Sequence, residues 1–166
     1  MLSVRLRGSV TTTLAIDPGK AIGLTWGQYS DTEPWRKTAS AIWSFEELSE
    51  RLGRWARYPD KLIIERFVPQ SGAEYTLKED DLAAVEVIGV LKYALVPYVN
   101  EVYWQTRSDK WDIPDELLKD HDLWVTGTHV KHTDGRDAND ATIHSLHFMK
   151  NTVRHLPTLR RYWSGS

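Results

Sequence analysis

Short apolar runs bounded by turn residues predict β-strands along this chain. The first run, residues 11–17, ends at an acid, Asp17, and the Pro-Gly pair after it is a turn signal. A second apolar run starts at Ile22, so the two runs are expected to pair as a hairpin. Together, the predicted strands cover residues 11–17, 22–27, 38–43, 61–65 and 101–105.

Apolar residues at helical spacing alternate with the later strands. A capping box that starts at Ser44 predicts a helix that ends near Tyr58. Residues 78–99 and 138–155 predict two long helices, and one or two short helices are expected within residues 108–121. Three strands followed by alternating helices and strands predict an α/β protein with a mixed five-stranded sheet flanked by helices.

A chain of 166 residues is long enough to form one domain with its own core. We expect a single domain over residues 1–166, with a flexible N-terminal arm at 1–10 and a tail at 156–166. No apolar run approaches the roughly 20 residues that a membrane span needs, and the N-terminus is too polar for a secretory signal. We therefore expect a cytoplasmic protein without a membrane partner.

Cysteine is absent, which excludes disulfides, thiolate metal sites and a cysteine nucleophile. Any metal must then be held by oxygen or imidazole ligands, and this favours Mg²⁺ or Mn²⁺ over zinc. The formal net charge of −2 is unusual for a nucleic-acid-binding domain. A metal site that uses four acids would leave 19 of the 23 acids against 21 Lys and Arg, so local basic clusters matter more than the total.

Four acids stand out by their positions in the predicted elements. Asp17 and Glu65 each end a strand, and parallel neighbouring strands would bring both carboxylates to the same edge of the sheet. Asp137 and Asp140 are three residues apart at the start of a helix and share one face. Acids packed together need a cation, and oxygen ligands suit Mg²⁺ or Mn²⁺. Each acid alone can be a solvated strand end, a turn residue or a helix cap, but the order and spacing of all four are more specific.

This pattern is typical of phosphodiester hydrolysis with two metal ions. Two ions roughly 3.5–4 Å apart can stabilise the attacking and the leaving oxygen, one by activating water and the other by holding the 3′ oxygen. Asp17 comes from the central strand and is the expected bridging ligand. Glu65, Asp137 and Asp140 would complete the two ligand sets.

The segments that carry these acids resemble the RuvC-type Holliday junction resolvases of the RNase H-like superfamily. Residues 17–23, Asp-Pro-Gly-Lys-Ala-Ile-Gly, are similar to the first strand-turn motif of that family. Residues 62–65 resemble its second catalytic strand, and residues 137–141, Asp-Ala-Asn-Asp-Ala, resemble its closing helix start. The motifs follow the family's order over most of residues 11–155, and the divergent segments between them favour a bacteriophage member.

The resemblance implies an RNase H-like endonuclease that resolves Holliday junctions and other branched DNA by paired nicks. It also implies a homodimer with two Mg²⁺ or Mn²⁺ ions per active site. The family's acidic positions carry over to Asp17, Glu65, Asp137 and Asp140. Asp137 stands where the family admits other ligand types. Phe67 lies one residue closer to the second acid than the family's junction-opening aromatic, and Tyr75 is a rival for that role.

Basic residues near the predicted site are candidates for phosphate contacts, which position DNA without reading its sequence. They are Lys20, Arg107, Lys110, Lys131 and Arg136. The arginines of the first predicted helix form either a DNA surface or a solvated face. His144 and His147 share the helix face of Asp140, and they either support the metal site or are packed, hydrogen-bonded histidines.

The helix at residues 78–99 has more apolar positions than one buried face needs. The surplus indicates either a dimer surface or a helix buried on two sides, and a two-fold dimer would present two active sites to two strands. Alternative functions are a less selective nuclease for forks, flaps or RNA–DNA hybrids, an actin-like ATPase, and a non-catalytic RNase H-like scaffold. No second Gly-rich phosphate turn supports the ATPase, and the presence of all four acids argues against the scaffold.

Overall fold

The computed structural model describes residues 9–68, 78–126 and 135–164. Its strands are β1 (Thr11–Asp17), β2 (Ile22–Tyr29), β3 (Arg36–Trp43), β4 (Lys61–Glu65) and β5 (Glu101–Gln105). Its α-helices are α1 (Phe45–Leu52), α2 (Glu79–Ala94), α3 (Asp115–Asp120), α4 (Arg136–His147) and α5 (Leu156–Trp163). Three short helices complete the order, η1 (Val96–Tyr98), η2 (Arg107–Asp112) and the π-helical η3 (Phe148–Val153).

The strands form one mixed sheet in the order β3-β2-β1-β4-β5. The β1–β2 and β2–β3 pairs are antiparallel, whereas the β1–β4 and β4–β5 pairs are parallel. The prediction of a mixed five-stranded sheet flanked by helices is therefore confirmed. Because Ile16 of β1 pairs with Ile64 of β4, the next residue of each strand, Asp17 and Glu65, lies at the same edge of the sheet.

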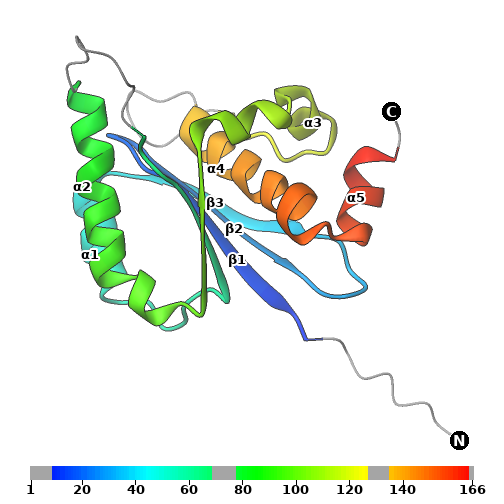
Figure 1. Ribbon diagram of the computed structural model, residues 1–166, viewed down its shortest axis with the longest axis horizontal. Coiled ribbons are helices and arrows are strands. Elements are labelled where there is room, and N and C mark those ends of the chain that lie inside the picture. The colour runs from blue at the N-terminus through cyan, green and yellow to red at the C-terminus, as the bar shows by residue number, and fades with distance from the viewer. Residues whose placement is uncertain (1–8, 69–77, 127–134, 165–166) are drawn as a thin grey trace, which may run out of the picture.

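Each face of the sheet carries its own apolar core, since side chains alternate along a strand. On β1, Leu14 and Ile16 pack with α1 and α2, whereas Ala15 faces the opposite core beneath α4 and α5. Figure 1 shows these two layers, with α1 and α2 on one side of the sheet and α3, α4 and α5 on the other. Asp17 and Glu65 thus lie at the ends of two neighbouring central strands, between two packed layers.

The predicted elements are confirmed, but several helix boundaries differ. Helix α1 has the predicted capping box at Ser44 and ends at Leu52, before Gly53, instead of near Tyr58. Helix α4 starts two residues earlier than predicted, after Gly135. Gly135 has a φ of +90°, and a Cβ there would lie 2.6 Å from the Val125 carbonyl oxygen, so the turn into α4 requires glycine.

Much of the segment that the sequence analysis describes as a tail is helical. Residues Leu156–Trp163 form α5, whose Thr158 and Tyr162 are buried against the core. The Trp35 backbone N–H donates to Thr158 Oγ1 at 2.8 Å, and the Tyr162 hydroxyl donates to the Trp35 carbonyl at 3.0 Å. These contacts join α5 to a segment more than 120 residues earlier, a pairing that no local pattern predicts. The predicted N-terminal arm lies mostly outside the described residues.

None of the helices in the described ranges is long and apolar enough to cross a membrane.

Candidate metal centre

Helix α4 is seated across the end of β1 by contacts with β2. A Cβ on Gly23 would lie 1.9 Å from the Asp137 carbonyl oxygen, so only glycine lets the strand approach the helix this closely. Further along β2, Thr25 Oγ1 donates to the Ala138 carbonyl at 3.1 Å. The glycine that ends the first motif therefore sets the position of the helix that carries the third motif.

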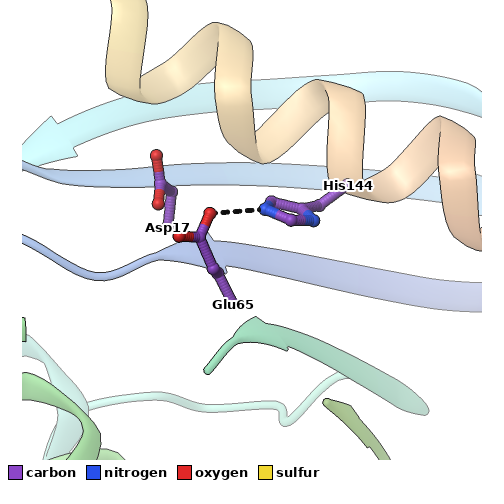
Figure 2. A group of neighbouring side chains, drawn as sticks. All are labelled: Asp17, Glu65 and His144. Atoms are coloured by element: carbon purple, nitrogen blue, oxygen red, sulfur yellow. Dashed lines mark hydrogen bonds and ion pairs between the residues drawn. The ribbon is translucent and has the colours of Figure 1, made fainter. Parts of the chain in front are cut away.

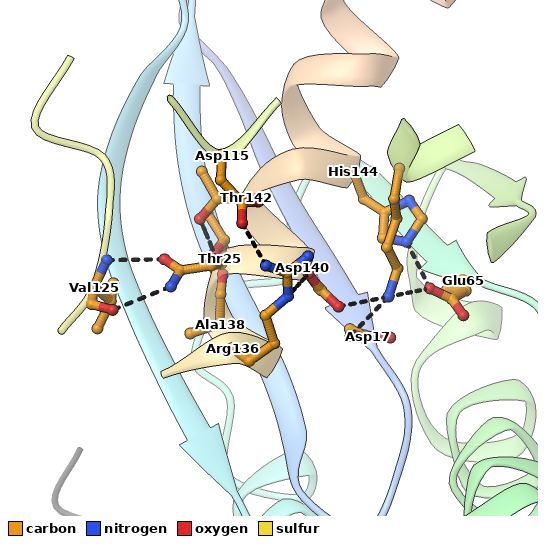
Figure 3. Close-up of polar contacts among 12 residues, drawn as sticks. Asp17, Thr25, Glu65, Asp115, Val125, Arg136, Ala138, Asp140, Thr142 and His144 are labelled. Carbon is orange, nitrogen blue, oxygen red and sulfur yellow. Dashed lines mark hydrogen bonds and ion pairs between the residues drawn. The ribbon is translucent and has the colours of Figure 1, made fainter. Parts of the chain in front are cut away.

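One buried amide joins Val125 to the first turn of α4. Asn139 accepts from the Val125 N–H at 2.8 Å and donates to the Val125 carbonyl at 3.0 Å. Figure 3 shows the two hydrogen bonds at the labelled Val125. As a result Asp140, one residue later, points toward the end of β1.

Lys110 joins three of the four predicted acids. Its Nζ lies 3.1 Å from Asp17 Oδ2, 2.7 Å from Glu65 Oε2 and 2.8 Å from Asp140 Oδ2. The side chains are largely buried, with 12% of Lys110 and 10% of Asp17 exposed. Lys110 was predicted to face DNA, whereas the structure directs its ammonium into the acids. Its position follows from η2, which begins directly after β5.

The pKa values show how strongly these charges act on one another. Burial raises the pKa of Asp17 well above its ordinary value, an effect that Lys110 only partly offsets and that Glu65 and Asp140 reinforce. Burial also acts on Glu65, but the hydrogen bond from His144 and the charge of Lys110 outweigh it and lower the pKa of Glu65 to about 2. Burial alone would lower the pKa of Lys110, and the three carboxylates raise it instead. Lys110 therefore offsets only part of the cost of burying these three carboxylates together.

Asp140 is held from the outside by Arg136, one turn earlier on α4. Arg136 Nε lies 2.9 Å from Asp140 Oδ1, and its Nη1 lies 2.7 Å from Asp115 Oδ2. Apart from this ion pair, the buried Oδ1 atom accepts no well-directed hydrogen bond from the residues that the structure describes. An oxygen of this kind is suited to a cation.

His144 is part of the same cluster, although the sequence left its role open. It is fully buried on α4, and its Nε2 lies 2.8 Å from Glu65 Oε2. Ligand atoms of Asp17, Glu65 and His144 all lie within 4.8 Å of one another, as Figure 2 illustrates. Two carboxylates and an imidazole at this spacing fit a divalent cation. Asp140 lies close to this group, because its carboxylate contacts the same Lys110 ammonium.

A cavity of about 780 Å³ opens over the cluster. It is lined by all four predicted acids and by five of the predicted DNA-contacting residues, namely Lys20, Phe67, Arg107, Lys110 and Arg136. Asp137 faces this cavity but lies outside the group of three close ligand residues. Lys20 forms ion pairs with two acids of α2, Glu79 at 2.9 Å and Asp80 at 3.4 Å. Tyr75 and Lys131 lie outside the described residues.

The structure also places His147 and Trp111 relative to the cluster. His147 Nδ1 lies 3.0 Å from Asn151 Nδ2, and His147 is not in the close ligand group. Trp111 follows Lys110 on η2, is 84% exposed and lines the cavity. Trp111 could not be identified from the sequence, because an isolated aromatic in a poorly periodic segment gives no sign of its exposure.

Comparisons with known proteins show the fold. No family model matches the chain, and no curated protein matches it in sequence. Two solved structures of Thermus thermophilus RuvC match with a TM-score of 0.51. One, a complex with a Holliday junction substrate, is 13% identical and covers 86% of this chain and 97% of that chain. The other is 15% identical and covers 84% of this chain and 96% of that chain. The chain thus has an α/β fold like that of RuvC, which confirms the predicted RNase H-like architecture.

Proposed function

We propose that this protein is a metal-dependent endonuclease that resolves Holliday junctions and related branched DNA by paired nicks. The observation that carries the proposal is the cluster of Asp17, Glu65 and Asp140 at one edge of a RuvC-like sheet. Three largely buried carboxylates around one ammonium are costly to assemble. Binding of divalent cations for phosphodiester cleavage would explain why the protein keeps them together.

The residues divide into metal ligands and groups that hold them. Asp17, Glu65 and Asp140 are the ligands with the best support, and Asp137 is the fourth ligand in the proposal. A pair of divalent cations, Mg²⁺ or Mn²⁺, supplies the charge that stabilises an in-line phosphodiester displacement. Arg136 keeps Asp140 directed at the centre, and Lys110 neutralises the acids before a cation binds.

The cavity over the acids is the proposed path of the DNA. Arg107 and Lys20 lie on its wall and can contact phosphates, while Phe67 and Trp111 offer ring faces to unpaired bases near a branch point. The choice of a four-way junction follows from the fold likeness to RuvC, one structure of which holds a Holliday junction substrate. A phage source and a cytoplasmic location remain predictions from the sequence.

Helix α2 is the proposed dimer surface. Its outer face exposes Leu82, Val85 and Tyr93 to 48%, 46% and 87%. Gly89 lies between them, and a Cβ there would meet nothing within 4 Å, so a second helix has room to approach. An exposed apolar stripe of this kind favours self-association, and a two-fold dimer would supply the two sites that paired nicking requires.

The test is cleavage of a synthetic four-way junction in Mg²⁺ or Mn²⁺ by the wild-type protein and by Asp17→Asn and Glu65→Gln. We expect symmetrical nicks in opposite strands and a loss of more than about 100-fold in both variants, since even residues behind metal ligands cost 10- to 100-fold. His147→Gln, on the same helix as Asp140 but outside the cluster, should cut normally. The site assignment is wrong if both acid variants cut as fast as the wild type.

The same assay separates the proposal from its alternatives. Forks, flaps, linear duplex and RNA–DNA hybrids of matched sequence are cut side by side with the junction. Preference for the junction supports a resolvase, whereas equal cutting of forks and flaps indicates the less selective nuclease. Absence of cutting on every substrate with either metal would contradict the proposed function.

A further inference from the structure

Gln105 orients the imidazole of His144 through its Nδ1 atom. This glutamine ends β5 and pairs directly with Glu65 of β4 in the parallel ladder. Its side chain is buried, with 5% of the residue exposed, and it contacts His144 twice. Gln105 Nε2 donates to the His144 carbonyl oxygen at 3.2 Å, and Gln105 Oε1 lies 2.5 Å from His144 Nδ1.

These two contacts fix a proton on His144 Nδ1. The His144 carbonyl oxygen can only accept, so the glutamine must place its amide nitrogen there. The amide oxygen is then the atom that faces His144 Nδ1, and Nδ1 must donate to it. His144 Nε2 is the nitrogen that faces the acids, 2.8 Å from Glu65 Oε2, and a cation bound there would replace its hydrogen bond to that carboxylate.

We propose that His144 is a ligand of the metal held by Asp17 and Glu65, and that its imidazole gives the site a preference for Mn²⁺ over Mg²⁺. The inference rests on the proposed function only in that both require a divalent cation at this cluster. Nitrogen ligands suit Mn²⁺ better than Mg²⁺, which favours oxygen ligands and retains its waters. Gln105 is the positioning residue, because a metal-binding histidine generally donates its other ring N–H to a fixed acceptor.

The partner of Nε2 distinguishes this histidine from a merely packed one. Any buried histidine needs polar partners for its ring nitrogens. The partner of His144 Nε2 is a carboxylate of the ligand cluster, Glu65, which is also in contact with the Lys110 ammonium at 2.7 Å. His144 Nε2 is also within 4.8 Å of a ligand oxygen of Asp17, on the next strand. Asp17, Glu65 and His144 thus surround the proposed cation, and Gln105 holds His144 in place.

The direct test is pulsed electron paramagnetic resonance of the wild-type protein loaded with Mn²⁺ alone. Direct coordination by His144 should give nitrogen coupling to the Mn²⁺ spin, and the coupling should disappear in His144→Gln. His147→Gln is the matched control on the same helix and should retain it. Lack of nitrogen coupling in the folded wild type would overturn the inference without any variant.

Calorimetric titration with Mn²⁺ and with Mg²⁺ provides the second readout. We expect His144→Gln to weaken Mn²⁺ binding by about 10- to 100-fold and Mg²⁺ binding by clearly less, so that the preference for Mn²⁺ falls. Gln105→Leu removes the acceptor for Nδ1 and should weaken Mn²⁺ binding in the same direction. Equal losses for both metals would refute the preference for Mn²⁺, and circular dichroism identifies any variant that fails to fold.

The two proposals can fail separately. Nitrogen coupling without cleavage of any DNA would leave the metal ligand in place and refute the nuclease. Junction cleavage in a protein without nitrogen coupling would support the nuclease and refute the role of His144.

Discussion

Replacement of Lys110 by methionine tests the electrostatic account of the site most directly. Methionine keeps the length and apolar stem of lysine but removes the charge shared by Asp17, Glu65 and Asp140. In the absence of divalent metal the variant must bury Asp17 and Glu65 without the shared ammonium, while Asp140 keeps only its ion pair with Arg136. We expect the apo protein to lose stability and a metal ion to restore it.

The magnitude follows from the burial of the cluster. Removing one partner of a buried ion pair costs about 3–5 kcal/mol, because the remaining charge is left uncompensated. Asp17 can relieve part of this cost by taking a proton, since burial already raises its pKa. We therefore expect a loss of about 3 kcal/mol in the free energy of unfolding. For a chain of this size, that corresponds to a fall in Tm of roughly 6–12 °C.

The pH dependence of this loss has a defined sign. In the wild type the pKa of Glu65 falls from 4.5 to about 2, so Glu65 stabilises the fold above pH 4.5 and loses this effect as the pH falls toward 2. The raised pKa of Asp17 acts in the opposite sense, and its stabilising effect is lost as the pH rises above 3.8. Without Lys110 the first contribution shrinks and the second grows. The variant should therefore differ most from the wild type at neutral pH, and the difference should shrink as the pH falls toward 2.

Thermal unfolding in EDTA, repeated with Mn²⁺ and across pH, measures these effects. Lys119→Met, on the exposed surface of α3, is the matched control and should unfold like the wild type. Mn²⁺ should raise the Tm of Lys110→Met more than that of the wild type, because no ammonium competes for Glu65 and Asp140. A variant as stable as the wild type in EDTA at neutral pH, or one that Mn²⁺ does not stabilise, would refute the reasoning.

Three other predictions follow from the same structure. Gly23→Ala should push the start of α4 away from β2 and cost about 1–3 kcal/mol with a loss of junction cleavage, whereas Gly53→Ala, where a Cβ meets nothing within 4 Å, should be neutral in both assays. Val85→Glu should convert the proposed dimer to a monomer in sedimentation, and a wild type that is already a clean monomer at high micromolar concentration would contradict the dimer. Metal binding should release protons in calorimetry at mildly acidic pH and tighten as the pH rises, because burial raises the pKa of Asp17 and the metal requires the carboxylate; binding that is independent of pH would contradict this assignment.

The sheet was predictable because its signals are local. Each strand is a short apolar run, and the acids that end β1 and β4 mark where the chain leaves the core. The Pro-Gly turn after Asp17 and the capping box at Ser44 are complete within a few residues. The parallel β1–β4 pair then brings Asp17 and Glu65 together without further information. For these residues, the local sequence is enough to predict where they lie in the fold.

The parts of the site that could not be predicted depend on contacts between distant segments. Lys110 is a basic residue after a strand, and no neighbour in the sequence indicates that its ammonium turns toward Asp17, 93 residues earlier. His144 shares a helix face with Asp140, but its role depends on Gln105, 39 residues away. The packing of helix α5 could not be predicted for the same reason, because its buried residues contact Trp35 in the first third of the chain.

Two consecutive elements, β5 and η2, supply the residues of the site that the three motifs do not contain. Strand β5 delivers Gln105 beside Glu65, and η2 immediately after it delivers Lys110 to the same carboxylate. The acids thus come from β1, β4 and α4. Lys110, which neutralises them, comes from η2, and Gln105, which orients His144, comes from β5. Substitutions of these two residues should change metal preference and apo stability while every acid stays in place. Lys110→Met and Gln105→Leu separate these effects, since the first removes a charge and the second leaves the charge unchanged but removes both contacts that orient His144.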